Sequence, residues 1–178
     1  MATEEKTLFT GSRFQVVRLQ QVTARGDHSR DIVRHPGSVT IIPLLPENRV
    51  CLIRNFRVAV GKPLLELPAG TREPGEDPQV TAVRELEEET GYRANHIERL
   101  AGFYVSPGFV DERMELFLAT DLTTGPPARE IGEEIENVIL DWTAIETEID
   151  AGRIEDAKTL AGLWLARRWL DRNPQPSS

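Results

Sequence analysis

The sequence is poor in cysteine, in dense basic stretches and in long apolar runs. Cys51 is the only cysteine, which excludes a disulfide framework and a thiolate metal cluster. Its apolar neighbours Val50 and Leu52 predict a buried strand position rather than a catalytic thiol. No run approaches the roughly 18 apolar residues that a membrane-spanning helix needs. The start, "MATEEKTLFTG", lacks the order of a secretory signal, so we expect a soluble, cytoplasmic protein.

Positive charge is also scarce. The sequence has 21 Lys and Arg residues against 29 Asp and Glu residues, which gives a net charge of -8. No dense Lys/Arg tract is present, which argues against a nucleic-acid-binding surface. An anionic substrate therefore needs a local cation. The histidines, His28, His35 and His96, fall in separate segments without metal-like spacing, and His35 in "RHPG" is predicted to be a turn residue.

The length of 178 residues, 39% of them hydrophobic, suits one compact domain with a short appendage. Residues 1–36 contain β-rich stretches with partial alternation, which predict a small N-terminal β-sheet domain. Residues 37–172 give strands, a helix over 77–91, more strands and a final helix from 156 to 172. This order predicts a mixed sheet packed between helices, an α+β or α/β sandwich. The last residues, 173–178, are predicted to be a disordered tail.

The helix expected over 77–91 is strongly acidic. Asp77 is a good N-cap, Pro78 suits the first turn, and Gly91 suits the residue past the end. A helical projection groups Val80, Val83 and Leu86 as an apolar stripe, with Glu85, Glu88 and Glu89 on the opposite face. Like charges at this spacing repel. Such carboxylates either face open water, or titrate, or hold a divalent cation such as Mg²⁺ or Mn²⁺.

The stretch from Gly70 to Tyr92 has a more specific pattern. Gly70, Glu76, "REL" at 84–86, "EE" at 88–89, Gly91 and Tyr92 fill every fixed position of the Nudix box, G-x(5)-E-x(7)-R-E-U-x-E-E-x-G-U. Only Tyr92 departs mildly, being aromatic where an aliphatic residue is usual. The chain thus resembles the Nudix hydrolases, which implies an α/β/α sandwich that cleaves a nucleoside diphosphate linked to another moiety.

The resemblance also implies a metal site. The ligands would be the carbonyl of Ala69 and the side chains of Glu85, Glu88 and Glu89, and the ion would be Mg²⁺, with Mn²⁺ as the alternative. Gly70, Glu76 and Arg84 would hold the loop against the helix and orient those ligands.

Similarity to the ADP-ribose pyrophosphatases within this family extends from about Val33 to Leu170. It is carried by "IRNFRVAVGKPLLELPAG", by "SPGFVDE" with Pro107 fifteen residues after Tyr92, and by "GRIEDAKTLAGLWLA". The resemblance implies that Arg54 and Arg57 contact the substrate's phosphates, although their spacing of three on a strand points them to opposite faces unless a bulge intervenes. Pro107, Gly108 and Glu112 would line the terminal ribose.

The catalytic base would be a glutamate in the loop "PPAREIGEEIEN", which precedes the last strand. Glu133 is the first candidate and Glu130 the second, with Glu112 as a further alternative; Glu89 also counts among the catalytic residues. The competing interpretation is that the loop acids are merely solvated.

The implied reaction is metal-dependent hydrolysis of ADP-ribose to AMP and ribose 5-phosphate. A Nudix pyrophosphatase for GDP-mannose or ADP-glucose is an alternative, because the box touches only the diphosphate and metal. A non-catalytic ligand sensor is a second alternative, opposed by the intact box glutamates. The resemblance further implies a homodimer that exchanges its N-terminal sheets, and we expect the helix with Trp164 and Trp169 to contribute contacts.

Overall fold

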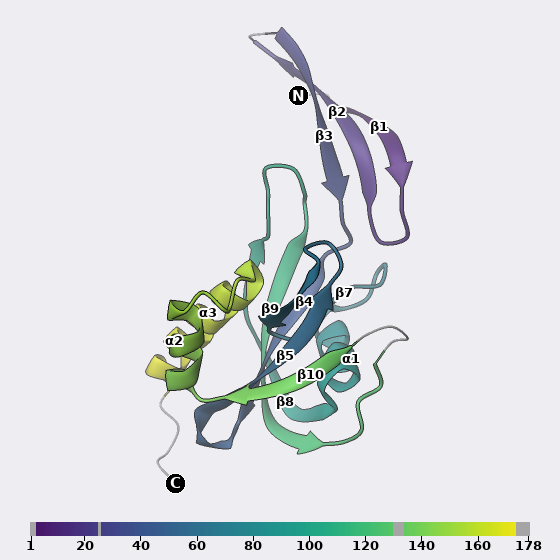
Figure 1. Cartoon of the computed structure of the whole chain (residues 1–178). Coiled ribbons are helices and arrows are strands. Elements are labelled where there is room, and N and C mark those ends of the chain that lie inside the picture. Colours follow the sequence, from purple (N-terminus) through teal and green to yellow (C-terminus); the bar gives the residue numbers. More distant parts are fainter. Residues whose placement is uncertain (1–2, 25, 130–133, 174–178) are drawn as a thin grey trace.

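A computed structural model describes residues 3–24, 26–129 and 134–173 (Figure 1). The strands are β1 (Thr3–Thr10), β2 (Gln15–Thr23), β3 (Gly26–Arg34), β4 (Ser38–Leu45), β5 (Arg49–Arg57), β6 (Lys62–Glu66), β7 (Ala69–Thr71), β8 (Tyr92–Tyr104), β9 (Arg113–Thr124) and β10 (Ile135–Leu140). The helices are α1 (Pro78–Thr90), α2 (Trp142–Asp150) and α3 (Ala157–Arg172), with a short 3-10 turn at Pro46–Asn48. Within the described residues, no helix is long and apolar enough to cross a membrane.

The central sheet is mixed, with the order β10-β5-β4-β9-β8. β4 runs parallel to β9 along residues 38–43, whereas the other pairs are antiparallel. On its other side β4 pairs with β5 only at Leu44 and Leu45, and with the short β7 at residues 38–40. β4 therefore diverges from β5, and the segment that carries β7 enters the sheet between them.

Helices cover both faces of this sheet, as Figure 1 shows, with α1 on one side and α2 and α3 on the other. The alternation along β4 explains this layering, because Val39 and Ile41 join the core beneath α1 while Ile42 and Leu44 join the core beneath α3. Cys51 is buried in the α1 core, as its flanks predicted. The predicted α/β/α sandwich is confirmed.

The N-terminal strands form a separate antiparallel sheet in the order β1-β2-β3, which stands away from the main body (Figure 1). Its attachment is the end of β3, where Val33 exchanges backbone hydrogen bonds with Phe109 and Asp111. Arg34 strengthens this joint, since it binds Asp111 at 2.8 Å and Glu5 at 2.6 Å. The predicted small N-terminal sheet is thus present.

Local signals place α1 correctly. The Asp77 side chain accepts a hydrogen bond from the Gln79 N–H, Pro78 opens the helix, and Gly91 ends it in the left-handed conformation. Of its apolar stripe, Leu86 is buried, with 1% of its surface exposed. Val80 and Val83 are 58% and 44% exposed, whereas Glu89 is only 4% exposed. The helix turns part of its acidic face inward, toward the segment that carries β7.

Helix α2 was not predicted from the sequence, from which only the strand before it was expected. It is a nine-residue helix capped by Asp141, whose side chain accepts a hydrogen bond from the Ala144 N–H. Ile145 alone is fully buried on it, so the apolar periodicity that reveals a longer helix is weak here.

Candidate active site

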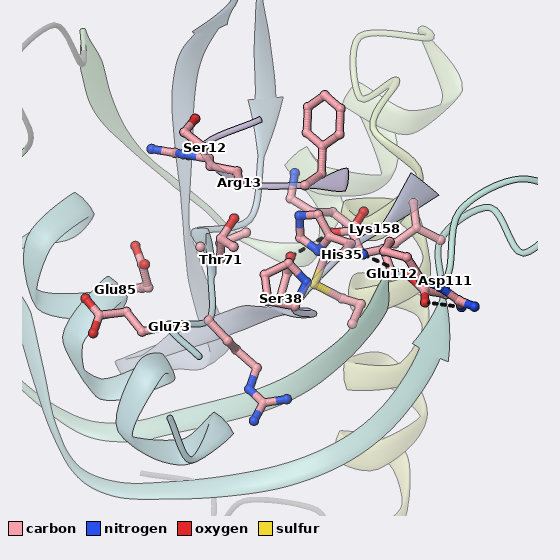
Figure 2. A pocket seen from close by; sticks show the side chains of 18 of the residues that line it. Ser12, Arg13, His35, Ser38, Thr71, Glu73, Glu85, Asp111, Glu112 and Lys158 are labelled. Atoms are coloured by element: carbon pink, nitrogen blue, oxygen red, sulfur yellow. Dashed lines mark hydrogen bonds and ion pairs between the residues drawn. The ribbon is translucent and has the colours of Figure 1, made fainter. Parts of the chain in front are cut away.

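A cavity of about 900 Å³ lies where the N-terminal sheet, α1, α3 and the main sheet meet. Its lining comes from the β1–β2 turn (11–15), the β3–β4 junction (34–36 and 38), β7 and the loop after it (69–74), α1 (84, 85, 88 and 89), the β8–β9 connection (105, 111 and 112), and single positions at 57, 114 and 156–158. In the view of Figure 2, Glu73 and Glu85 lie on one side of the pocket, and His35, Glu112 and Lys158 on the other. The cavity is thus lined by the four predicted metal ligands, Ala69, Glu85, Glu88 and Glu89, and by Gly70 and Arg84, whereas Glu76 is not part of the lining.

The loop and the helix of the box touch directly. A Cβ atom on Gly70 would lie 1.8 Å from Cδ of Glu85, so only glycine leaves room for that carboxylate. The backbone N–H of Ala69 donates to Oε2 of Glu89 at 2.9 Å. These two contacts hold the backbone of residues 69 and 70 against the carboxylates of α1.

Arg84 gathers the remaining acids. Its Nη1 lies 2.8 Å from Oε1 of Glu85 and 2.9 Å from Oε2 of Glu88, and its Nη2 lies 3.4 Å from Oε2 of Glu76. Burial opposes the charge of Arg84, but hydrogen bonds to the three acids prevail and raise its pKa above the ordinary value. The guanidinium thus offsets the repulsion between the glutamates.

Glu76 is fixed at the start of the box. The Glu73 N–H donates to its carboxylate, and this hydrogen bond, followed by those from Arg84, lowers the pKa of Glu76 from 4.5 to about 2. Its backbone oxygen accepts from Arg72 at 2.5 Å. The loop from 72 to 76 is therefore fastened to α1 through charged hydrogen bonds.

The donor set suits a hard divalent cation, because three carboxylates and a backbone segment lie on the same wall. Across the described residues, no three acidic, histidine or cysteine side chains are already arranged around a common ion position. Arg84 and the Ala69 N–H instead bind these carboxylates. The geometry of ligation therefore stays a prediction, while the chemistry of the residues fits.

The predicted substrate residues separate into two groups. Arg57 and Glu112 line the cavity, whereas Arg54, Pro107 and Gly108 do not. Arg54 is exposed on β5. The pKa of Glu148 on α2 is lowered mainly by a hydrogen bond from Arg153, and the charge of Arg54 adds to this effect. This outcome follows from the three-residue spacing, which turns the two arginines to opposite faces. The loop candidates Glu130 and Glu133 lie outside the described residues.

Glu112 is engaged at the joint with the N-terminal sheet. The Ser38 hydroxyl donates to Oε1 of Glu112 at 2.6 Å, and Nδ1 of His35 lies 4.0 Å from the same oxygen. His35 also accepts a hydrogen bond from the Gly37 N–H, as expected of a turn residue, yet it lines the cavity as well.

Sequence reasoning missed several lining residues. The β1–β2 turn contributes Arg13 and Phe14, and α3 contributes Lys158 just after its N-cap Asp156. The helix start at Asp156 could be recognised from the sequence, but nothing local indicated that Lys158 reaches a cavity shared with α1. Such placement depends on the packing of distant elements.

Comparison with known proteins identifies the family. Residues 34–163 match the model of the NUDIX domain. The chain belongs to the Nudix family. This matched region contains the whole box and most of the cavity wall, while the β1–β2 turn lies before it. Nudix hydrolases generally use divalent metal ions, in agreement with the donor set on α1.

Two relatives and one solved structure are similar over most of their lengths. The "Methanol dehydrogenase activator" of Bacillus methanolicus is 40% identical over 165 residues, which cover 88% of this chain and 89% of that protein. The "ADP-ribose pyrophosphatase" of Bacillus subtilis is 38% identical over 132 residues, which cover 73% of this chain and 71% of that protein. The crystal structure of an ADP compounds hydrolase has a TM-score of 0.83 at 23% sequence identity. The match covers 97% of this chain and 95% of that chain, which supports the fold.

Proposed function

We propose that this Nudix hydrolase cleaves the diphosphate of ADP-ribose, adding water to give AMP and ribose 5-phosphate. The observation that carries the proposal is the wall formed by Gly70, Glu85 and Glu89 in a cavity of about 900 Å³. The similarity to an ADP-ribose pyrophosphatase supports the choice of substrate.

We assign the metal ligands as predicted from the box, namely the Ala69 carbonyl and the carboxylates of Glu85, Glu88 and Glu89, and Mg²⁺ as the ion, with Mn²⁺ as the alternative. A bound divalent ion would neutralise charge on the phosphate oxygens and make a coordinated water more acidic. Gly70 provides the space for Glu85. Glu76 and Arg84 keep the loop and helix together, so that the ligands need little rearrangement.

Arg57 is the cation that we assign to the substrate's diphosphate. It lines the cavity from the end of β5, and its side chain is 39% exposed, so part of it stays accessible to a ligand. A planar guanidinium suits phosphate oxygens because it donates two parallel hydrogen bonds. It supplies the local cation that the acidic chain otherwise requires.

The proton of the attacking water needs an acceptor, and we assign this role to Glu133, with Glu130 as the second candidate. Both belong to the loop that precedes β10. Glu112 is a further alternative, supported by its place in the cavity lining.

We also propose that the working unit is a homodimer. Support comes from the three-stranded N-terminal sheet, which exposes large apolar side chains such as Leu8, Phe9 and Phe14. A sheet of this size gains little stability alone. Trp164 on α3 is 60% exposed and offers a second apolar contact.

The proposed reaction is tested by incubating the protein with ADP-ribose, ADP-glucose, GDP-mannose, diadenosine polyphosphates and flavin dinucleotide in the presence of Mg²⁺. Phosphate is measured after coupling to a phosphatase, which acts on the released monophosphates. The highest kcat/KM for ADP-ribose supports the proposal. A higher value for GDP-mannose or ADP-glucose would replace the substrate, and no turnover of any compound would favour a ligand sensor.

A further inference from the structure

A buried carboxylate lies behind the cavity wall opposite α1. Glu66, at the end of β6, is only 1% exposed, although it stands in the apolar run "LLELPAG". Burying a carboxylate is costly unless cations and hydrogen bonds compensate it. The residues that compensate Glu66 are therefore informative.

Both oxygens of Glu66 are bound by cations that line the cavity. Nε of Arg57 donates to Oε1 at 2.7 Å, and Nζ of Lys158 donates to Oε2. Lys158 has a second carboxylate partner in Asp156, at 2.8 Å. Glu66 itself does not line the cavity, so it acts on a ligand there only through the side chains that it holds.

The same region fixes α3 to the segment before the box. The Thr159 hydroxyl accepts from the Leu67 N–H at 2.8 Å and donates to Asp156 at 2.5 Å. Two residues later, the Ala69 N–H binds Glu89. Residues 66 to 69 thus connect α3 on one side with the acidic helix on the other.

Arg57 lies within the electrostatic reach of acids from both sides, Glu66 and Asp156 near α3 and Glu89 on α1. Burial opposes its charge, but the hydrogen bond to Glu66 and the charges of Glu66, Glu89 and Asp156 prevail, and its pKa is raised. Glu66 accepts a hydrogen bond from Nε of Arg57. Because a guanidinium has five N–H donors, the terminal nitrogens of Arg57 can donate to a ligand. An arginine fixed by one such bond loses less rotamer freedom when a phosphate binds.

We propose that Glu66 is a positioning residue for the diphosphate, which acts by holding Arg57, with Lys158 completing the neutralisation of its carboxylate. This inference rests on the proposed function, because it takes Arg57 as the cation that binds the substrate. Glu66 therefore acts on substrate affinity more than on the chemical step.

The test is a double-mutant cycle on the full-length chain with ADP-ribose, or with the best sugar nucleotide of the panel. Glu66→Gln is expected to raise KM about tenfold or more, because a neutral amide holds Arg57 less firmly than a carboxylate does, while kcat changes little. In an Arg57→Ala background, Glu66→Gln is expected to raise KM no further. Glu66→Asp keeps the charge and is expected to raise KM less than Glu66→Gln.

A matched control is Glu155→Gln. Glu155 binds Lys62 at 2.5 Å and so links the same strand to the segment before α3, but the pair is half-exposed and does not line the cavity. This variant is expected to keep the wild-type KM. The melting temperature of each variant, measured with and without Mg²⁺, reports folding separately from affinity.

The outcomes distinguish this inference from the proposed function. An Arg57→Ala variant with the wild-type KM would remove the substrate role of Arg57 and the inference with it. A raised KM in Arg57→Ala beside a wild-type KM in Glu66→Gln would overturn the inference alone. The same result follows if Glu66→Gln and Arg57→Ala raise KM by independent, multiplying factors. If Glu66→Gln does not fold, Glu66→Asp carries the same comparison.

Discussion

The Glu85 carboxylate lies against the backbone of Gly70 so closely that a Cβ atom there would stand 1.8 Å from Glu85 Cδ. The contact joins the loop of the box to its helix, and it involves the flexible end of a side chain rather than a second backbone. Substitution at position 70 therefore displaces a functional group without forcing the fold apart.

Gly70→Ala is expected to lower turnover about a hundredfold, because moving a catalytic group by an ångström has an effect of that order. The melting temperature should change little, since Glu85 can swing away. Gly125→Ala is the control, because its Cβ would meet the Gly91 oxygen at an ordinary 3.5 Å. A Gly70→Ala enzyme with full activity would show that Glu85 need not occupy this position.

Glu76 makes stability depend on pH. Its pKa is about 2 when folded, against an ordinary value of 4.5, so its contribution is complete above the unfolded pKa and is lost as the pH falls through about 2. Glu76→Gln should therefore lower the melting temperature at pH 7, and the difference from wild type should shrink as the pH falls from 5 toward 2. Glu98→Gln, at an exposed position of β8, is the matched control for removal of one carboxylate. Parallel melting curves at every pH would contradict the role of Glu76.

Glu89→Gln separates function from architecture. The amide oxygen can still accept from the Ala69 N–H, so the metal-free variant should be about as stable as wild type. Turnover should collapse, and the rise in melting temperature produced by Mg²⁺ should be smaller, because a ligand bound only by the native state stabilises it. Calorimetry with and without Mg²⁺ measures this rise. An identical shift in both proteins would eliminate Glu89 as a metal ligand.

Glu133→Gln is expected to lower kcat by roughly two to four orders of magnitude while metal-dependent substrate binding is retained. Steady-state kinetics and equilibrium binding of ADP-ribose in Mg²⁺ measure the two effects. Unchanged turnover would move the role of base to Glu130 or Glu112, which the same substitution tests in turn.

Sedimentation velocity should show a dimer at micromolar concentration. Phe9 on β1 is 55% exposed, and its ring is tilted by 46° against that of Phe14, with ring centres 6.2 Å apart. Phe9→Glu should therefore shift the protein toward monomer by placing a charge on an apolar contact. A wild-type monomer under these conditions would refute the proposed assembly.

Features that depend on neighbouring residues, such as the ends of a helix, were predicted correctly from the sequence. The ends of α1 follow from Asp77 and Gly91, which act within one turn of the helix. Periodicity alone could not show which residues of α1 are buried. It groups the exposed Val80 with the buried Leu86, whereas charged hydrogen bonds to residues 69–76 turn part of the acidic face inward.

The far wall of the cavity depends on tertiary contacts. Glu66 and Lys158 are 92 residues apart and meet only because α3 packs over the end of β6. The sequence presents Glu66 as an anomaly in an apolar strand, which signals a buried charge without naming its partner. Arg54 lies outside the cavity lining, in keeping with the three-residue spacing that puts it and Arg57 on opposite faces of β5.

The parallel pairing of β4 with β9 has a consequence for biosynthesis. The strands that flank β4 and the helix that delivers Lys158 come from separate parts of the chain, and α3 follows all the described strands in sequence. A nascent polypeptide can form the acidic helix early, but Glu66 then has only Arg57 as a cation until α3 leaves the ribosome. Contacts so distant in sequence form slowly. The cavity therefore stays incomplete until α3 has been made, and a chain truncated before α3 retains the box without the wall that faces it.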